Sequence, residues 1–282
     1  MNENGQGKLY ICATPIGNLG DITPRVIEVL KAVDIIAAED TRNSIKLLNH
    51  FEIKTPMTSY HEYNRFDKAD ELVAEMQKGK DIAIITDAGT PCISDPGEVL
   101  VQKCVENDIE VTSLPGPSAV ITALTLSGFS VRRFVFEGFL PPVQKKKERR
   151  EALDRLRNET GSIVIYEAPH HLKETLTELS EVLGGDRRIA LCREMTKKHE
   201  EVLRLTIAEA IKTEPRGEYV LVIEGRDRDE LIKEKTESFL SMSVKEHVQS
   251  YIDKGLSEKD AMKAAAADRG ISKRDIYNEL KR

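Results

Sequence analysis

The chain has 282 residues and a formal net charge of −6, with 40% apolar and 32% charged residues. This length suits about two ordinary domains, and the composition can form buried cores under a well-solvated surface. No segment approaches the roughly 20 apolar residues that cross a bilayer, and the first residues lack the features of a signal peptide, so we expect a cytoplasmic protein without a membrane segment. The acidic balance counts mildly against nucleic-acid binding without excluding it, because local basic patches matter more than the total.

The cysteines and histidines do not form a metal-binding pattern. Cys12, Cys92, Cys104 and Cys192 are widely spaced and lack a C-x-x-C pair, which predicts free, buried thiols and neither a disulfide framework nor a zinc site. The histidines lack an H-x-x-x-H pair. We therefore expect no metal in this protein.

Short apolar runs alternate with helical periodicity through the first part of the chain. Strands are predicted at residues 9–13, 34–38, 82–86 and 109–114, and helices at 24–31, 42–51, 65–78, 96–107 and 118–126. Thr23 is the expected N-cap of the first helix, and Asp95 with Glu98 has the spacing of a capping box. Strands and helices that alternate at this spacing predict a largely parallel sheet.

A second alternating unit follows a basic stretch at residues 141–157. Strands are predicted at residues 162–168, 189–194, 201–205 and 219–224, and helices at 172–183 and 207–212. These strands are less purely apolar, so we expect a mixed sheet. The expected domains are residues 1–125 and 126–228, followed by a helix-turn-helix-like tail at 240–282 with helices at 244–254, 258–268 and 273–280.

Three loops follow strands of the first unit. The loop 14–21 precedes a helix, and Glu39 and Asp40 follow the next strand, but the absence of G-x-G-x-x-G argues against dinucleotide binding and leaves a plain turn or another cofactor loop. The loop 87–97 is more informative, because Gly89 permits close approach of a ligand while two prolines stiffen the backbone. It contains no lysine, so it suits a nucleoside better than a triphosphate; an ordinary Gly-Pro turn is the alternative. Ser118 begins the helix after the third loop.

Carboxylates also follow two strands of the second unit. Glu167 lies at the end of the strand 162–168, and Glu194 ends the strand 189–194, with Arg193 and Lys197 beside it. These segments predict either a second wall of the same cleft or a salt-bridged surface.

Together these segments resemble the tetrapyrrole-methylase-like class of S-adenosylmethionine-dependent methyltransferases. Within that class they resemble the bacterial enzymes that methylate the 2′-oxygen of a cytidine ribose in 16S rRNA. The strings that carry the resemblance are residues 10–22, 38–42, 59–62, 86–97, 114–119, 136–141, 166–171 and 192–197. The resemblance implies an α/β protein with two α/β/α domains, a ligand cleft between them and a small C-terminal helical segment. It also implies S-adenosylmethionine as cofactor, 16S rRNA or the 30S subunit as substrate at the decoding region, and a homodimer.

The resemblance, together with the chemistry of methyl transfer to a hydroxyl, suggests residue roles. The expected cofactor contacts are Pro15, Asp87, Gly89, Thr90, Ile93, Ser118, Ala119 and Tyr166. The expected catalytic residues are Glu194, Glu167 and Lys197, and Asp87 is a further candidate for accepting the proton of the ribose hydroxyl. The expected substrate contacts are Glu39, Asp40, Arg42, Arg193, Lys145, Lys146 and Arg149. Basic residues of the tail are further candidates for phosphate contacts, and solvated helix faces are the alternative for both basic segments.

Two other functions compete with rRNA methylation. A tetrapyrrole C-methyltransferase would need a cleft suited to a large polycarboxylate, and the loops show no concentration of arginine. A nucleic-acid-binding regulator built on the tail would leave the paired loops of two domains without a role.

Overall fold

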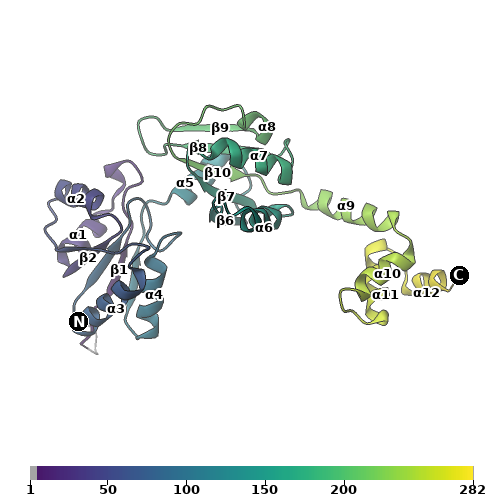
Figure 1. Ribbon diagram of the computed structural model, residues 1–282, viewed down its shortest axis with the longest axis horizontal. Helices are drawn as coiled ribbons and strands as arrows, with labels where there is room; N and C mark the ends of the chain where they lie inside the picture. The colour runs from purple at the N-terminus through teal and green to yellow at the C-terminus, as the bar shows by residue number, and fades with distance from the viewer. Residues whose placement is uncertain (1–4, 282) are drawn as a thin grey trace. The chain divides into compact units, whose positions relative to one another are not determined.

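The computed structural model describes residues 5–281 and contains two compact units (Figure 1). The larger unit comprises the described residues up to 157 together with residues 161–224. The smaller unit comprises residues 158–160 and the described residues from 225 onward. Among the described residues, no helix is both long enough and apolar enough to cross a membrane.

The first sheet of the larger unit is entirely parallel, as the sequence predicts. Its strand order is β3-β2-β4-β1-β5. The strands are β1 (Leu9–Cys12), β2 (Ile35–Ala38), β3 (Met57–Ser59), β4 (Ile82–Ile85) and β5 (Val111–Leu114). All five therefore end at the same edge, where the loops predicted to bind a ligand begin. The strand β3 was not predicted from the sequence.

Helices cover both faces of this sheet. The helices α1 (Pro24–Ala32) and α2 (Thr41–His50) pack on one face, and α3 (Arg65–Gln77) and α4 (Gly97–Glu106) pack on the other. A short 3₁₀ helix, η1 (Leu19–Asp21), precedes α1. Thr23 caps α1 as predicted, since its hydroxyl accepts a hydrogen bond from the Val26 amide at 3.3 Å. Alternate residues of each strand face the two helical layers, which gives the expected three-layer arrangement.

The prediction of a capping box at α4 is wrong. The N-cap position is Pro96, and the Asp95 carboxylate instead accepts hydrogen bonds from the amides of Gly97 at 2.7 Å and Cys92 at 2.8 Å. Asp95 therefore braces the loop that precedes the helix.

The second sheet is mixed, as predicted, with the order β6-β7-β10-β8-β9. The strands are β6 (Phe134–Phe139), β7 (Ser162–Glu167), β8 (Arg188–Arg193), β9 (Glu201–Thr206) and β10 (Tyr219–Ile223). Only the β6–β7 pair is parallel. Because β10 is antiparallel to both β7 and β8, its first residues lie beside the ends of those strands.

The second sheet is also covered on both faces. The helices α6 (Lys146–Leu156), α7 (Leu172–Leu183) and α8 (Ile207–Ala210) pack on one face. The helix α5 (Ala119–Ser127) packs on the other through Val120, Ala123 and Leu124. This helix falls mostly within the range expected for the first domain, yet its apolar residues contact the second sheet.

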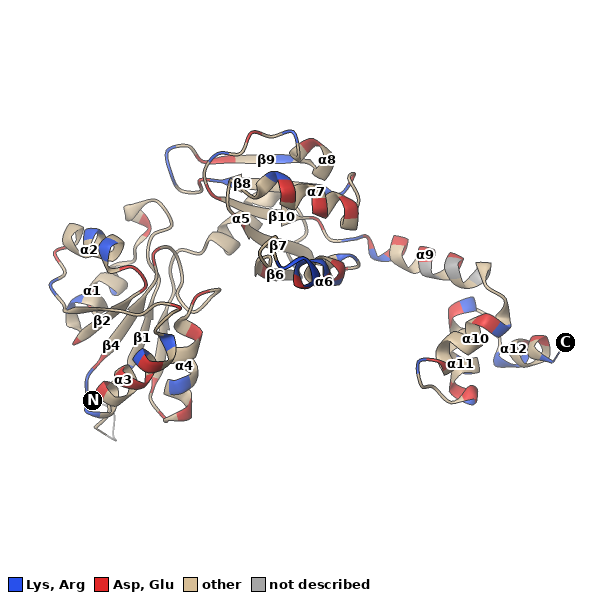
Figure 2. Ribbon diagram, in the orientation of Figure 1, with Lys and Arg blue, Asp and Glu red and all other residues tan. Residues whose placement is uncertain are grey.

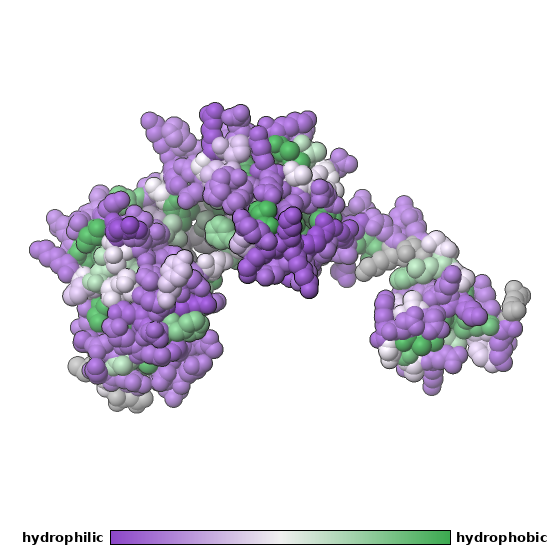
Figure 3. Space-filling model, viewed as in Figure 1, coloured by the Kyte–Doolittle hydropathy of each residue, from purple (hydrophilic) through white to green (hydrophobic). Residues whose placement is uncertain are grey.

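The smaller unit consists mainly of α9 (Arg228–Ser241), α10 (Val244–Ile252), α11 (Glu258–Arg269) and α12 (Lys273–Leu280). The last three match the predicted tail helices, and α9 was not predicted. Val248, Ala265 and Ile276 belong to its own apolar core. Ser272 and Asp275 form a capping box, whereas the Ser257 hydroxyl accepts from the Asp260 amide and donates to the Asp260 carboxylate. On the face drawn in Figure 3, apolar side chains are scattered among hydrophilic ones.

Candidate active site

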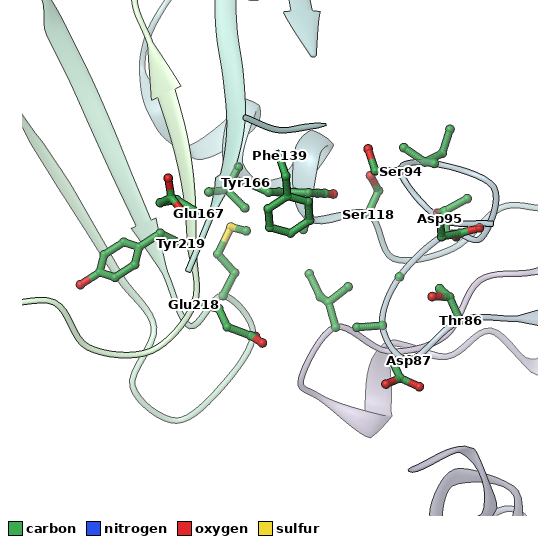
Figure 4. Close-up of a pocket in the computed structure, with 18 of the residues that line it drawn as sticks. Thr86, Asp87, Ser94, Asp95, Ser118, Phe139, Tyr166, Glu167, Glu218 and Tyr219 are labelled. Atoms are coloured by element: carbon green, nitrogen blue, oxygen red, sulfur yellow. The ribbon is translucent and has the colours of Figure 1, made fainter. Parts of the chain in front are cut away.

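A cavity of about 520 Å³ opens where the loops of the first sheet meet the edge of the second sheet (Figure 4). The part contributed by the first sheet and its loops consists of Ile16, Glu39, Thr86, Asp87, Ala88, Gly89, Thr90, Ile93, Ser94, Asp95, Ser118 and Ala119. The part contributed by the second sheet consists of Phe139, Tyr166, Glu167, Ala168, Glu194, Met195, Lys197, Glu218, Tyr219 and Val220. Its size lies in the range of small-molecule sites.

Hydrogen bonds join the three loops of the first sheet into one wall. Thr14 and Gly89 form an isolated bridge, with N···O distances of 2.8 and 3.1 Å between their backbones. The Thr14 hydroxyl donates to the Thr86 carbonyl, and the Thr90 hydroxyl donates to the Pro117 carbonyl, each at 3.0 Å. Gly89 has φ +85°, and a Cβ there would lie 3.2 Å from Ile16 Cγ2, so this position suits glycine in both conformation and space.

The loop between β4 and α4 has a strained backbone. Cys92 and Ser94 adopt positive φ angles of 69° and 59°, which residues with a side chain rarely adopt. These two residues flank Ile93, whose side chain is 51% exposed although it is apolar. Burial raises the pKa of the Asp95 carboxyl, while its hydrogen bonds from Gly97 and Cys92 oppose that shift. Strain of this kind persists where the surrounding structure enforces it and is frequent at ligand sites.

Two aromatic rings, tilted 54° from each other, form an apolar surface in the cavity. Phe139 and Tyr166 lie with ring centroids 5.3 Å apart, and Phe136 packs edge-on against Tyr166 at 5.1 Å. Phe139 is 61% exposed, and its ring lies between the two walls in Figure 4. Burial raises the pKa of Tyr166. An exposed ring supported by a half-buried one is suited to stacking against a planar group such as a nucleobase.

An ion cluster of Glu194, Lys197 and Glu218 lies on the side of the second sheet. Lys197 Nζ lies 3.1 Å from Glu194 Oε1 and 3.0 Å from Glu218 Oε2, and Glu194 Oε1 also accepts the Glu218 amide at 3.1 Å. That amide and the lysine lower the pKa of Glu194. Burial lowers the pKa of Lys197, but the two glutamates outweigh burial and the net shift is upward. Lys197 is therefore an ammonium ion at neutral pH.

A second group of carboxylates lies on the first wall. Desolvation raises the pKa of Asp87, a hydrogen bond from Asn43 partly opposes the shift, and the charge of Glu39 adds to it. Asn43 Nδ2 donates to Asp87 Oδ2 at 3.2 Å, whereas Glu39 Oε2 accepts from the Thr86 hydroxyl at 2.6 Å. Asp87 is thus a stronger base than an ordinary aspartate.

Glu167 belongs to a buried network. Its carboxylate accepts hydrogen bonds from the Ala168 amide at 2.8 Å and from the Thr175 hydroxyl. Arg149, which is only 4% exposed, donates to Thr175 at 2.7 Å, to Glu178 at 2.6 Å and to the Pro141 carbonyl at 2.8 Å. The prediction that Arg149 contacts RNA is therefore wrong, because its guanidinium group is buried and joins α6 to α7.

The charge of the cavity selects its ligand. Among the described residues, its lining has six carboxylates (Glu39, Asp87, Asp95, Glu167, Glu194 and Glu218) and one basic side chain, Lys197. Such a lining favours a cationic ligand and opposes a polyphosphate or a polycarboxylate.

Comparison with known proteins gives the family. The profile of Tetrapyrrole (Corrin/Porphyrin) Methylases matches residues 8–211. Ribosomal RNA small subunit methyltransferase I of Bacillus subtilis (strain 168) is 45% identical, over 99% of this chain and 96% of that protein. The chain belongs to the tetrapyrrole methylase family, in the branch of ribosomal RNA small subunit methyltransferase I. Members of this family use S-adenosylmethionine, and so does this chain.

Two further similarities bear on the fold and the tail. The Thermotoga maritima protein of the same branch is 45% identical and is covered completely, although the match spans only 78% of this chain. The solved uroporphyrin-III-C-methyltransferase from Thermus thermophilus is 16% identical with a TM-score of 0.55, over 78% of this chain and 94% of that one, and shares the fold.

The cavity fits the cofactor of a tetrapyrrole methylase. S-adenosylmethionine carries a sulfonium and an ammonium, which suit the acidic lining, and an adenine, which suits the surface of Phe139 and Tyr166. Ser118 makes no capping hydrogen bond with its side chain and opens α5, where backbone amides favour an anionic group such as a carboxylate.

Most of the predicted site residues line this cavity, and several do not. Those in the lining are Asp87, Gly89, Thr90, Ile93, Ser118, Ala119, Tyr166, Glu39, Glu167, Glu194 and Lys197. Pro15 lines a neighbouring cavity instead. Asp40 and Arg42 pair with each other at 2.7 Å, which lowers the pKa of Asp40 to about 2, and Arg193 pairs with Glu201 at 3.1 Å. Lys145 and Lys146 lie exposed at the start of α6, where basic residues gather (Figure 2).

Four residues of the lining were not predicted from the sequence, namely Glu218, Phe139, Met195 and Tyr219. Glu218 and Tyr219 stand at the start of β10, whereas only the ends of strands were considered as ligand sites. Phe139 ends β6, which was not predicted, although it lies within a string that carried the family resemblance.

We predict that Gly217→Ala impairs methyl transfer by displacing Glu194. Gly217 has φ +69°, and an added Cβ would lie 2.6 Å from Glu194 Oε1. Displacing a side chain that lines the cavity can reduce the rate by roughly 10²-fold, and the strained backbone costs about 1–3 kcal/mol. Single-turnover methylation and thermal unfolding measure the two effects separately.

Gly184→Ala is the matched control. Gly184 has φ +95° with no atom within 4 Å of an added Cβ, so it shares the backbone strain without the contact. Equal activity of the two variants would contradict the placement of Glu194 by Gly217.

Proposed function

We propose that the chain transfers a methyl group from S-adenosylmethionine to the 2′-oxygen of a cytidine ribose in the decoding region of 16S rRNA. The name of the relatives and the sequence resemblance support an rRNA substrate. The observation that carries the proposal is the acidic cavity with an exposed aromatic ring between the two sheets. S-adenosylmethionine supplies the activated methyl group, so the protein's task is to position the ribose and take up its proton.

We propose that the cofactor contacts the predicted residues of this cavity. Ser118 and Ala119 at the start of α5 would hold its carboxylate, and Gly89 and Thr90 offer backbone groups fixed by the loop hydrogen bonds. Tyr166 with Phe139, and Ile93 opposite, would enclose the adenine. Pro15 acts through the loop it stiffens, since it does not line this cavity.

The hydrogen bonds distinguish among the candidate proton acceptors. Asp95 and Glu167 each accept two hydrogen bonds from the protein, and Lys197 is already protonated. Asp87 has a raised pKa, because desolvation outweighs its hydrogen bonds from the Asn43 side chain and the Asp40 backbone. We therefore propose that Asp87 accepts the proton of the ribose 2′-hydroxyl. Glu194 orients Lys197, so that the lysine ammonium ion faces the negative charge that develops on the ribose oxygen.

A tetrapyrrole substrate fits the cavity less well. Polycarboxylate macrocycles require several cationic side chains, and Lys197 is the one basic residue in the described lining. The family alone therefore does not make this chain a porphyrin methylase.

The direct test is methylation with labelled S-adenosylmethionine of 30S subunits, free 16S rRNA or a porphyrinogen. We expect label in rRNA and, after digestion, in 2′-O-methylcytidine identified by mass spectrometry. Label in the porphyrinogen, on a base, or in neither RNA would overturn the proposal. A comparison of the two RNA substrates determines whether the assembled subunit is required.

Other features follow from this substrate. Lys145 and Lys146 are proposed phosphate contacts. Glu39, Asp40, Arg42 and Arg193 are also proposed to contact the RNA, near the cofactor loops and the strand ends. An rRNA substrate implies a cytoplasmic location. We also propose a homodimer, which light scattering would detect as twice the mass of the chain.

We predict that deletion of residues 240–282 weakens binding to 30S subunits while cofactor affinity stays unchanged. The cofactor cavity lies in the larger unit, and 78% of this chain covers the whole Thermotoga maritima relative. The half-buried Lys273 and the exposed Arg274 are proposed phosphate contacts, whereas Arg269 is not, since it donates to His247 and to backbone carbonyls. Each lost phosphate contact reduces the salt slope of binding by about 0.7–0.9. Unchanged RNA affinity and salt slope would exclude the tail as a binding element.

A further inference from the structure

A second cavity, of about 310 Å³, lies next to the cofactor cavity. It is lined by Thr14, Pro15, Gly17, Leu19, Asn43, Ser44, Lys46, Leu47, His50, Thr86 and Asp87. Thr86 and Asp87 line both cavities, so a molecule extending past Asp87 would contact both. The second cavity lies between the loop 14–21 and the helix α2 (Thr41–His50).

The two cavities differ in charge. Six carboxylates line the described part of the cofactor cavity, whereas Asp87 is the one carboxylate in the described lining of the second cavity. Lys46 and His50 are exposed on α2 one turn apart and both line the second cavity. Lys46 forms no ion pair with the residues that the structure describes. Anionic groups are therefore opposed in the first cavity and favoured in the second.

A buried hydroxyl in the second cavity lacks a partner. Ser44 is 4% exposed, and its Oγ has no hydrogen-bond partner within the described part of the chain. Leaving a buried polar group unpaired costs about 1–3 kcal/mol, so native proteins rarely do so without a reason. Because Ser44 lines the cavity, a ligand bound there would supply the hydrogen-bond partner that the Ser44 hydroxyl lacks.

The rest of the lining includes apolar residues and residues that contact the proposed catalytic side chains. Pro15, Leu19 and Leu47 offer apolar surface, and Leu19 is partly exposed. Asn43 joins this cavity to the proposed base through its hydrogen bond to Asp87. A Cβ at Gly17 would lie 2.4 Å from Lys197 Cγ, so the loop also packs closely against the catalytic lysine. Occupancy of the second cavity is thus structurally linked to both proposed catalytic side chains.

We propose that the second cavity binds the phosphodiester and sugar of the RNA strand beside the methylated nucleotide. Lys46 and His50 contact the phosphate, and Pro15, Leu19 and Leu47 pack against the neighbouring nucleoside. This arrangement would hold the 2′-hydroxyl at Asp87, where the two cavities meet. The inference rests on the proposed function, because it requires an RNA substrate at the Asp87 site.

The test compares Lys46→Ala, Lys46→Arg and the control Lys31→Ala in the full chain. Lys31 is exposed in the last turn of α1, which starts at the loop edge of the parallel sheet and runs toward the opposite edge. The substrate is 30S subunits from a strain lacking this methyltransferase, and the readouts are kcat, KM, salt dependence and the Kd for S-adenosylmethionine. A lost charged hydrogen bond predicts about a tenfold rise in KM for Lys46→Ala, with the salt slope reduced by about 0.7–0.9. We expect unchanged cofactor Kd, and partial recovery in Lys46→Arg.

The outcomes separate the two proposals. If the wild-type protein methylates 30S subunits and Lys46→Ala matches Lys31→Ala in KM and salt slope, the second cavity is not a phosphate site. A fall in kcat alone, with KM and salt slope unchanged, would also overturn the inference. If the wild-type protein does not methylate 30S subunits or 16S rRNA, the proposed function itself fails.

Discussion

Asp87→Asn is expected to reduce single-turnover methyl transfer by about 10²–10⁴-fold, the usual contribution of a general base. Asparagine keeps the shape of the side chain and can accept a hydrogen bond, but it cannot take up the ribose proton. The Kd for S-adenosylmethionine should change much less than the rate, because several other residues line the same cavity. Rapid-quench measurement with labelled cofactor separates these effects. Asp67→Asn, the same substitution at an exposed position of α3, is the matched control.

The pH dependence provides a second test of Asp87. The ionised form is the base, so the wild-type rate should rise with pH through a pKa above the ordinary aspartate value and then level off. Asp87→Asn should lack that limb. A wild-type rate that is flat from pH 4 to 7, or a limb that persists in the variant, would assign the proton to another group.

The Asp87→Asn substitution should change the stability of the fold in the opposite direction from the activity. A raised pKa means that the folded protein holds the Asp87 proton more tightly than the unfolded chain does. The stability gained from that proton is complete below the unfolded pKa and is lost as pH rises through the folded pKa. At neutral pH, the unionisable asparagine should therefore leave the Tm unchanged or slightly raised. A marked fall in Tm would attribute the lost activity to misfolding.

Hydrophobic patterning predicted most elements of the fold but failed where strands or helices lack a strong pattern. The strand β3 has only three half-buried residues, and β6 has a register shift between Phe136 and Gly138 that interrupts alternation. The helix α9 is rich in charged residues. Continuous buried strands such as β4 were predicted almost to the residue, since four consecutive apolar residues between two helical patterns leave little ambiguity.

The site shows a different limit of sequence analysis. Loops after parallel strands meet at one edge, so Asp87 and Ser118 could be expected to face a ligand, whereas the role of Tyr166 came from the family resemblance. Residue type alone does not reveal which carboxylates are already satisfied. Asp95 accepts a hydrogen bond from the backbone, and Glu167 accepts one from a buried threonine. Arg149 is buried although its helix is basic and its sequence is typical of a solvated helix face. These roles depend on packing between elements distant in the sequence.

Arg149→Ala is expected to lower the free energy of unfolding by about 3 kcal/mol, since removing the buried arginine of a partly buried ion pair leaves Glu178 and two further acceptors unpaired. Arg149 Nε lies 2.6 Å from Glu178 Oε2, and its other nitrogens donate to Thr175 and to the Pro141 carbonyl. For a unit of this size, the change corresponds to a Tm lower by roughly 6–12 °C. Thermal unfolding followed by circular dichroism measures it. Arg150→Ala, the next residue on α6 with an exposed pair to Asp154, should change the free energy by no more than about 0.5 kcal/mol.

The same substitution should weaken cofactor binding although Arg149 does not line the cavity. Arg149 donates to the Thr175 hydroxyl, which in turn donates to Glu167 at the end of β7. Glu167 follows Tyr166, whose ring forms part of the cavity wall, so loss of the arginine loosens that wall from behind. Titration calorimetry with S-adenosylmethionine should therefore show weaker binding in Arg149→Ala than in Arg150→Ala at a temperature where both remain folded. Equal Kd values would mean that the network stabilises the second sheet without positioning Tyr166.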